Sequence, residues 1–234
     1  MNPSSPAAPA AAPLPKVPLA PWPSLAPERP RTWERGGKGR SLPRFEGSAA
    51  LAPWLQRLRA HDPATEAHAR RVAFWAVRLG QALGLPQADL HLLHWAGLLH
   101  DLGKIRVPRA VLHRRGRLTP AEWQMIRQHP RWGYEIAGAI PSLPPKVREA
   151  ILHHHERWDG RGYPAGLKGK ALPPLARILA VADAWDAMRS PRPYRPALSL
   201  EQARDQLIQG AGKQWDPVLI SRFLTCLPAS SKPL

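Results

Sequence analysis

Residues 98–104 read Leu98-Leu99-His100-Asp101-Leu102-Gly103-Lys104, and this stretch predicts both the fold and the site. It has the pattern of an apolar helix whose last turn ends at a glycine. Successive residues on a helix are about 100° apart, so His100 and Asp101 lean toward one point. Together they offer one nitrogen and two oxygens, and a carboxylate with two free oxygens can bridge two metal ions. We expect Gly103 to take a left-handed conformation past the helix end and to turn Lys104 back toward the carboxylate.

A buried His-Asp pair needs polar partners, and candidates lie far along the chain. They are His68, His129, His154, His155 and Asp183. Asp183 stands among apolar residues, and we expect His129 at the end of a helix that begins at Thr119. Imidazoles and carboxylates without thiolates are typical of a site for iron, manganese, nickel or zinc. Two such ions about 3.5–4 Å apart can hold both the attacking and the leaving oxygen of a phosphoryl displacement.

Composition indicates a folded protein without disulfides that favours negatively charged partners. The chain has 234 residues, of which 44% are hydrophobic, enough for a core. The net charge of +17 favours polyanionic partners such as nucleic acid or phosphoesters, although a solvated basic surface would give the same charge. The single cysteine, Cys226, excludes an internal disulfide and a thiolate metal site. We expect a reducing, cytoplasmic location, and the lack of a run of eighteen apolar residues predicts no membrane span.

Residues 1–50 are rich in Pro and Ala, and we expect a disordered basic tail there, followed by one folded domain at 51–234. Asp62 before Pro63 and the sequence Thr-Pro-Ala-Glu at 119–122 are helix-start signals. Helical periodicity recurs along the folded part, and alternating strand patterns are absent. The fold class is therefore all-α. The expected helices cover 52–60, 64–83, 90–101, 108–112, 119–129, 145–155, 175–188, 199–209 and 217–227, with one or two further turns at 134–140.

The order of these residues resembles the HD-GYP domain, the cyclic-di-GMP phosphodiesterase branch of the HD metal-dependent phosphohydrolases. The resemblance covers residues 51–227. The motifs that carry it are His68, His100-Asp101, Gly103-Lys104, His129, His154-His155-Glu156, Asp159-Gly160-Arg161-Gly162-Tyr163-Pro164 and Val181-Ala182-Asp183. A lone His-Asp pair is common, but this ordered set is specific.

The resemblance implies an HD-type helical bundle around a metal centre. It assigns seven metal ligands: His68, His100, Asp101, His129, His154, His155 and Asp183. Asp101 is the bridging ligand, and Lys104 acts beside the attacking water or the scissile phosphate. Some relatives carry a glutamate four residues before the first histidine for a third metal, and Ala64 stands there in this chain. We therefore expect two divalent ions, iron or manganese first, with nickel or zinc as alternatives.

For the substrate, the resemblance assigns phosphate binding to Arg192 and Arg195, and site shaping or partner contact to Gly162, Tyr163 and Pro164. The implied function is hydrolysis of cyclic-di-GMP to the linear dinucleotide or GMP by a hydroxide that two metals activate. Two alternatives stay open. One is a phosphohydrolase acting on another cyclic dinucleotide, a nucleotide or an oligonucleotide. The other is a non-catalytic adaptor that senses cyclic-di-GMP and contacts a protein partner through the Gly-Tyr-Pro loop.

Overall fold

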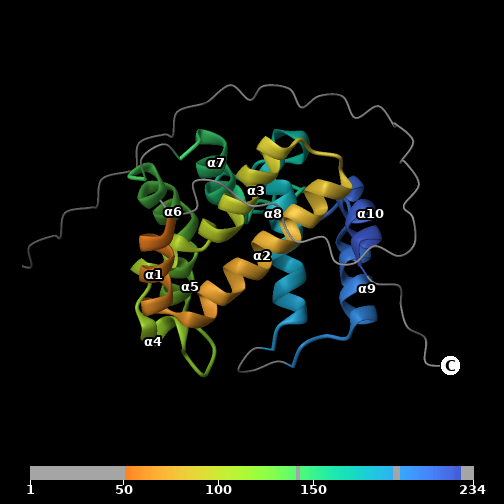
Figure 1. The fold of residues 1–234 in the computed structure, drawn as a ribbon. Helices are drawn as coiled ribbons and strands as arrows, with labels where there is room; N and C mark the ends of the chain where they lie inside the picture. The colour runs from red at the N-terminus through yellow and green to blue at the C-terminus, as the bar shows by residue number, and fades with distance from the viewer. Residues whose placement is uncertain (1–50, 141–142, 192–195, 228–234) are drawn as a thin grey trace, which may run out of the picture. The chain divides into compact units, whose positions relative to one another are not determined.

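A computed structural model of the chain describes residues 51–140, 143–191 and 196–227 (Figure 1). The disordered tail expected at 1–50 and the two predicted substrate residues Arg192 and Arg195 lie outside the described residues. Within the described part, no helix is long and apolar enough to cross a membrane.

The described residues fold into helices joined by turns and loops, the longest of which covers residues 154–168, and they form no β-strand. The elements are α1 (Ala52–His61), α2 (Pro63–Ala82), α3 (Gln87–Leu99), η2 (Leu102–Arg106), α4 (Arg109–Leu112), α5 (Pro120–Ile126), α6 (His129–Gly138), α7 (Pro145–His153), η3 (Gly169–Ala171), α8 (Pro174–Arg189), α9 (Leu200–Gly210) and α10 (Pro217–Cys226). The all-α prediction is confirmed.

The predicted helix-start signals act as caps. The Asp62 side chain accepts a hydrogen bond from the backbone N–H of Ala64, and Pro63 occupies the first helical position of α2. Thr119 and Glu122 form a reciprocal capping box at the start of α5. Each cap satisfies N–H groups that the first turn of a helix leaves without partners. The sequence therefore fixes where these helices begin.

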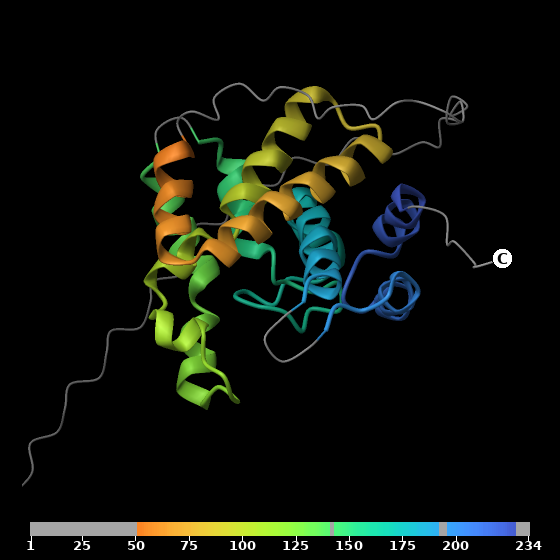
Figure 2. The same ribbon diagram turned by 60° about the horizontal axis from the view of Figure 1, so that its bottom comes forward.

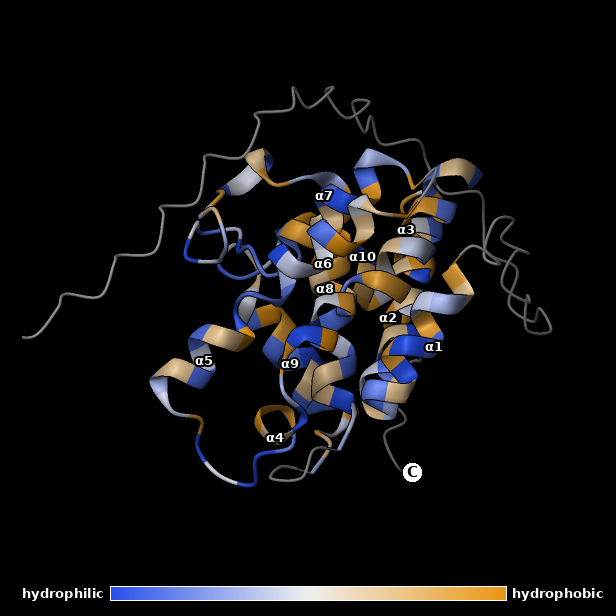
Figure 3. Cartoon of the chain, turned by 90° about the vertical axis from the view of Figure 1, so that its left-hand side faces the viewer, coloured by the Kyte–Doolittle hydropathy of each residue, from blue (hydrophilic) through white to orange (hydrophobic). Residues whose placement is uncertain are grey.

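Helix α2 runs through the middle of the bundle and packs against α1, α3, α8 and α10 (Figure 1). Apolar residues of these helices form one buried core. Figure 3 shows the hydrophobic stretches along the helices in orange. Gly97 of α3 lies against Ala73 of α2, where an added Cβ would contact the Ala73 backbone. This close approach brings the rings of His68 and His100 to a centroid distance of 5.2 Å. The α4–α5 segment projects from the bundle near the end that holds η2 (Figure 2).

The structure corrects the expected conformation of Gly103. Helix α3 ends at Leu99, and Gly103 lies inside the 3-10 helix η2 without a positive φ. Its lack of a side chain serves close packing instead, because a Cβ there would clash with the carbonyl oxygen of His129 and the amide of Gly133. Lys104 nevertheless turns back as predicted, with Nζ 2.7 Å from Asp101 Oδ2.

The expected position of His129 at a helix end was also wrong. The helix that begins after Thr119 ends at Ile126, and His129 is the first residue of α6. Helix α7 likewise ends at His153, so that His154 and His155 follow the helix. In both places the backbone leaves the helix at a turn, and this turn allows the histidine side chains to point toward His100 and Asp101.

Candidate metal centre

Seven side chains from separate elements meet at one place in the bundle. His68 comes from α2, His129 from α6 and Asp183 from α8, while the other four lie just beyond α3 and α7. Their potential ligand atoms form three overlapping groups, each within 4.8 Å: His129, His154 and His155; His68, His100 and Asp101; His100, His154 and Asp183. The structure thus brings together all seven residues that the sequence predicted as ligands. Their role as ligands stays a prediction.

Asp101 lies at the middle of the cluster and is almost fully buried. Its Oδ1 is 3.3 Å from Nε2 of His129. Its Oδ2 faces the other side, 3.4 Å from Nε2 of His100 and 3.8 Å from Nε2 of His68. The two oxygens therefore face different histidines, as a carboxylate that bridges two ions requires.

Backbone carbonyls orient three of the imidazoles. Nδ1 of His100, His129 and His154 lies 2.7–2.8 Å from the carbonyl oxygen three residues earlier in the chain. A carbonyl only accepts, so each Nδ1 carries the proton and donates it. Each neutral ring then keeps a lone pair on Nε2, the atom that faces the cluster. A hydrogen bond from the ring nitrogen that does not face the metal is typical of metal-binding histidines.

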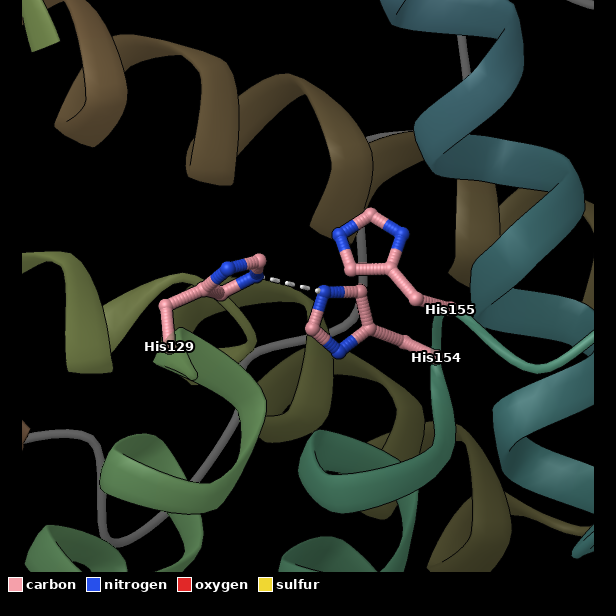
Figure 4. A group of neighbouring side chains, drawn as sticks. All are labelled: His129, His154 and His155. Carbon is pink, nitrogen blue, oxygen red and sulfur yellow. Dashed lines mark hydrogen bonds between the residues drawn. The ribbon is translucent and has the colours of Figure 1, made fainter. Parts of the chain in front are cut away.

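A cation between or beside the facing Nε2 atoms would satisfy their lone pairs. Nε2 of His129 and Nε2 of His154 are 3.2 Å apart (Figure 4). With both protons on Nδ1, this contact joins two lone pairs, which repel. Nε2 of His100 is buried without any hydrogen-bond partner. These atoms have the geometry and protonation that suit metal ligands, and the nitrogen and oxygen donors fit a divalent transition ion.

Burial keeps three imidazoles neutral. It lowers the pKa of His129 to about 3 and that of His155 to about 4, and it holds the pKa of His154 well below its ordinary value, with the neighbouring His155 adding to the effect. A neutral imidazole is the form that binds a metal. Burial would raise the pKa of Asp101, but the positive charge of Lys104 outweighs it and holds the pKa of this carboxyl well below its ordinary value.

His68 is held between two carboxylates. Its Nε2 is 3.0 Å from Asp183 Oδ1, and its Nδ1 is 2.7 Å from Asp186 Oδ2. Burial would lower the pKa of His68, but the hydrogen bonds to Asp183 and Asp186 raise it to about 9. Arg71 binds both oxygens of Asp186, from Nε at 2.7 Å and from a terminal nitrogen at 3.0 Å. Arg71 and Asp186 thus fix the orientation of His68 from outside the cluster.

The Gly-Tyr-Pro loop forms another wall of the cluster. The Tyr163 ring stacks on His155, with centroids 4.9 Å apart and planes at 28°. Gly162 packs on the backbone of Glu156 and Arg157, where a Cβ would clash. The buried Glu156 carboxylate accepts three backbone N–H groups of residues 165–167, at 2.6–3.1 Å. Glu156 therefore anchors the loop, and Pro164 follows Tyr163 through a cis peptide bond.

Some residues that contact the cluster from outside could not be identified as functional from the sequence. Asp186, three residues after Asp183, lies buried beside His68. Arg71 and Arg127 were not predicted. Their only signals are their positions, one helical turn after His68 and two residues before His129, and a basic residue at such a position predicts no chemistry by itself.

The helices bring together a cluster of histidines and aspartates that could hold metal ions, and comparison with known proteins gives the family. The HD domain family model matches residues 55–219. The chain belongs to the HD domain family, and the resemblance to its HD-GYP branch is confirmed.

Several curated proteins are similar in sequence. The cyclic di-GMP phosphodiesterase response regulator RpfG of Xanthomonas campestris is 40% identical over 164 residues, covering 70% of this chain and 43% of the relative. A 3′3′-cGAMP-specific phosphodiesterase of Vibrio cholerae is 36% identical over 161 residues, covering 68% of this chain and 31% of the relative. The chain thus spans less than half the length of these relatives.

Solved structures share the fold. A protein of Bdellovibrio bacteriovorus described as an HDG"Y"P protein aligns with a TM-score of 0.57 at 23% identity, covering 68% of this chain and 50% of that one. The similarity at this identity supports the helical architecture, in agreement with the family match.

Proposed function

We propose that this chain is a metal-dependent phosphodiesterase that hydrolyses cyclic-di-GMP to the linear dinucleotide, and in a second cut to GMP. One observation carries the proposal: the oxygens of Asp101 face separate histidines, within a cluster of seven potential ligands. The similarity to proteins named as cyclic dinucleotide phosphodiesterases supports the substrate class.

His68, His100, Asp101, His129, His154, His155 and Asp183 would hold two divalent ions, with iron or manganese proposed first and nickel or zinc as alternatives. When bound, such ions supply Lewis-acid stabilisation of the phosphoryl oxygens and lower the pKa of a water molecule. In the hydrolysis a water oxygen bonds to phosphorus, the bond from phosphorus to the ribose oxygen breaks, and that oxygen takes a proton.

Lys104 would act on the substrate from the edge of the cluster. Its ammonium group donates a hydrogen bond to Asp101 Oδ2 at 2.7 Å, and its side chain is 23% exposed. It is therefore a positive charge fixed beside the carboxylate yet open to a ligand. A cation in this place offsets negative charge that grows on the phosphoryl oxygens in the transition state. We assign it, with Asp101, to catalysis.

We assign phosphate binding to Arg192 and Arg195, and the wall of the substrate site to Gly162, Tyr163 and Pro164. Replacing Arg192 by Ala should raise the substrate KM more than it changes metal content. Loss of bound metal in that variant would contradict its assignment. A protein partner at the Gly-Tyr-Pro loop and a cytoplasmic location complete the proposal.

The experiment compares initial rates of the metal-loaded protein on cyclic-di-GMP, 3′3′-cGAMP and bis(p-nitrophenyl) phosphate, a generic phosphodiester. We expect the highest kcat/KM on cyclic-di-GMP. A preference for 3′3′-cGAMP would favour the second candidate function, which the 36% identity to a phosphodiesterase named for that substrate supports. Tight binding of cyclic-di-GMP without turnover by the metal-loaded protein would contradict hydrolysis and favour an adaptor.

A further inference from the structure

His155 differs from the other four histidines of the cluster in how it is held. Nδ1 of His68 is bonded to Asp186, and Nδ1 of His100, His129 and His154 is bonded to a backbone carbonyl. Among the described residues, no hydrogen bond joins either ring nitrogen of His155 to another group. Its ring nevertheless lies beside His129 and His154 (Figure 4), with centroids 5.0 Å and 4.1 Å away. Some other contact must fix its orientation.

Tyr163 supplies the contact. The two rings are stacked, and the backbone N–H of Tyr163 also donates to the carbonyl oxygen of His155 at 3.2 Å. The loop that carries Tyr163 is itself anchored by the three hydrogen bonds to Glu156. A ring on a fixed loop is a rigid surface, and stacking on it limits rotation of the His155 imidazole.

Arg127 contacts the same tyrosine ring. Its guanidinium carbon is 4.4 Å from the centroid of the Tyr163 ring, within the range of a cation–π interaction. Arg127 is the C-terminal cap of α5, and the next residue but one is His129. The carbonyl of Ile126, the last residue of α5, accepts the hydrogen bond from His129 Nδ1. The end of α5 is therefore connected to two neighbouring histidines, directly to one and through Tyr163 to the other.

We propose that Arg127 and Tyr163 are positioning residues that act on metal binding through His155, with stacking replacing the hydrogen bond that orients each of the other histidines. This inference rests on the proposed metal centre and deepens it. It gives Tyr163 a task beyond forming the wall of the substrate site. With its ring in contact with both Arg127 and His155, Tyr163 has less ring surface left to stack on a nucleobase.

The test measures metal affinity directly. Chelator-treated protein is titrated with Co²⁺, and the visible absorption of the bound ion gives the Kd and reports the ligand geometry. Tyr163→Leu should weaken Co²⁺ binding about tenfold and change the absorption spectrum, the size typical for loss of a group that orients a ligand. Tyr163→Phe keeps the stacked ring and should bind Co²⁺ within about twofold of wild type. Arg127→Met should give a smaller loss than Tyr163→Leu, and Arg127→Lys should recover part of it.

The chain offers a matched control. The guanidinium carbon of Arg148 is 5.8 Å from the centroid of the Tyr134 ring, and no side-chain hydrogen bond, ion pair or ring contact found among the described residues joins this pair to the seven potential ligands. Tyr134→Leu removes an Arg–Tyr contact of the same kind and should leave the Co²⁺ affinity and spectrum unchanged. Thermal melting of each variant shows whether it is folded, and if Tyr163→Leu is unfolded, Arg127→Met decides the question.

The outcomes separate this inference from the proposed function. Failure of the wild-type protein to bind Co²⁺ would overturn the metal centre itself. Normal Co²⁺ binding by wild type together with unchanged Kd and spectrum in folded Tyr163→Leu and Arg127→Met would overturn only the positioning role. A rise in substrate KM alone in those variants would assign them to substrate binding instead.

Discussion

The two outer edges of the metal cluster hold a histidine by different physical means. At one edge, His68 is fixed by charge, through hydrogen bonds to Asp183 and Asp186 and the Arg71 side chain behind them. At the other edge, His155 is fixed by contact with a ring, through Tyr163. Both edges end in an arginine, which pairs with a carboxylate at the first and lies over an aromatic ring at the second.

Because the two edges are held by different interactions, metal binding at each edge should respond to different perturbations. An ion-paired imidazole titrates with its carboxylates and responds to the loss of a single charge. A stacked imidazole depends on the shape and placement of the loop, and it stays neutral because burial lowers its pKa. The His68 edge should therefore respond to pH and to charge-removing substitutions, whereas the His155 edge should respond to substitutions that remove the ring or loosen the loop.

The largest effect is expected at the group that both edges share. Asp101→Ala removes the carboxylate whose oxygens face both sets of histidines, and it should abolish metal loading and turnover together. His100→Ala should act in the same way. Metal content by elemental analysis and hydrolysis of cyclic-di-GMP on the same samples check this expectation. Unchanged turnover in both variants would contradict the proposed centre.

The next prediction tests the His68 edge, where charged groups hold the histidine. Asp186→Asn keeps the shape but removes the charge that orients His68, and it should weaken metal binding about 10–100-fold. Asp216→Asn is the matched control, because Asp216 is also a buried aspartate that accepts a hydrogen bond from an arginine, Arg177, and no hydrogen bond or ion pair of its side chain involves a cluster residue. Its Kd should stay within about twofold of wild type. Equal effects of the two substitutions would show that the charged edge does not act on the metal.

A smaller effect tests the stacked edge through its loop. Glu156→Gln replaces a buried carboxylate that accepts three backbone N–H groups, and its amide NH₂ cannot accept. We expect a loss of about 1–3 kcal/mol in the free energy of unfolding, measured with urea. The Tyr163 ring should lose order as the loop loosens, so that near-ultraviolet circular dichroism changes. A variant as stable as wild type would mean that the loop is held by other contacts.

The last effect is a dependence of stability on pH in the chelator-treated protein. The pKa of His68 is raised from 6.5 to about 9 on folding, so its contribution is complete below pH 6.5 and is lost as pH rises through about 9. His129 and His155 have lowered pKa values, so their contributions are already complete above pH 6.5 and constant in this window. Urea unfolding at pH 6.5 and 9 should show this decline, and a smaller decline in Asp186→Asn. An equal decline in wild type and in Asp186→Asn would show that Asp186 does not raise the pKa of His68.

The sequence predicted the members of the cluster better than their local backbone. Residue types in a fixed order identify His68, His100 and Asp183 because the chemistry of the centre restricts them. The conformation of Gly103 was mispredicted because a glycine after an apolar helix is also what close packing against α6 requires, and the packing partner lies far along the chain. The turn before His129 was missed because its capping signal at Thr119 marks only where α5 begins.

The supporting residues were harder to predict for a physical reason. Arg71 and Arg127 act through distances to Asp186 and Tyr163, and these distances exist only after the helices have packed. A basic residue on a helix is usually a solvated one, particularly in a chain of net charge +17.

One measurement tests the central claim most directly. Protein purified without added metal, and again after chelation and reloading with Mn²⁺ or Fe²⁺, is analysed for bound metal and assayed on cyclic-di-GMP in the same sample. We expect about two ions per chain when loaded, hydrolysis that disappears on chelation, and recovery of both on reloading. Hydrolysis that persists without metal, or a folded chain that takes up no ion, would contradict a centre built from these seven side chains.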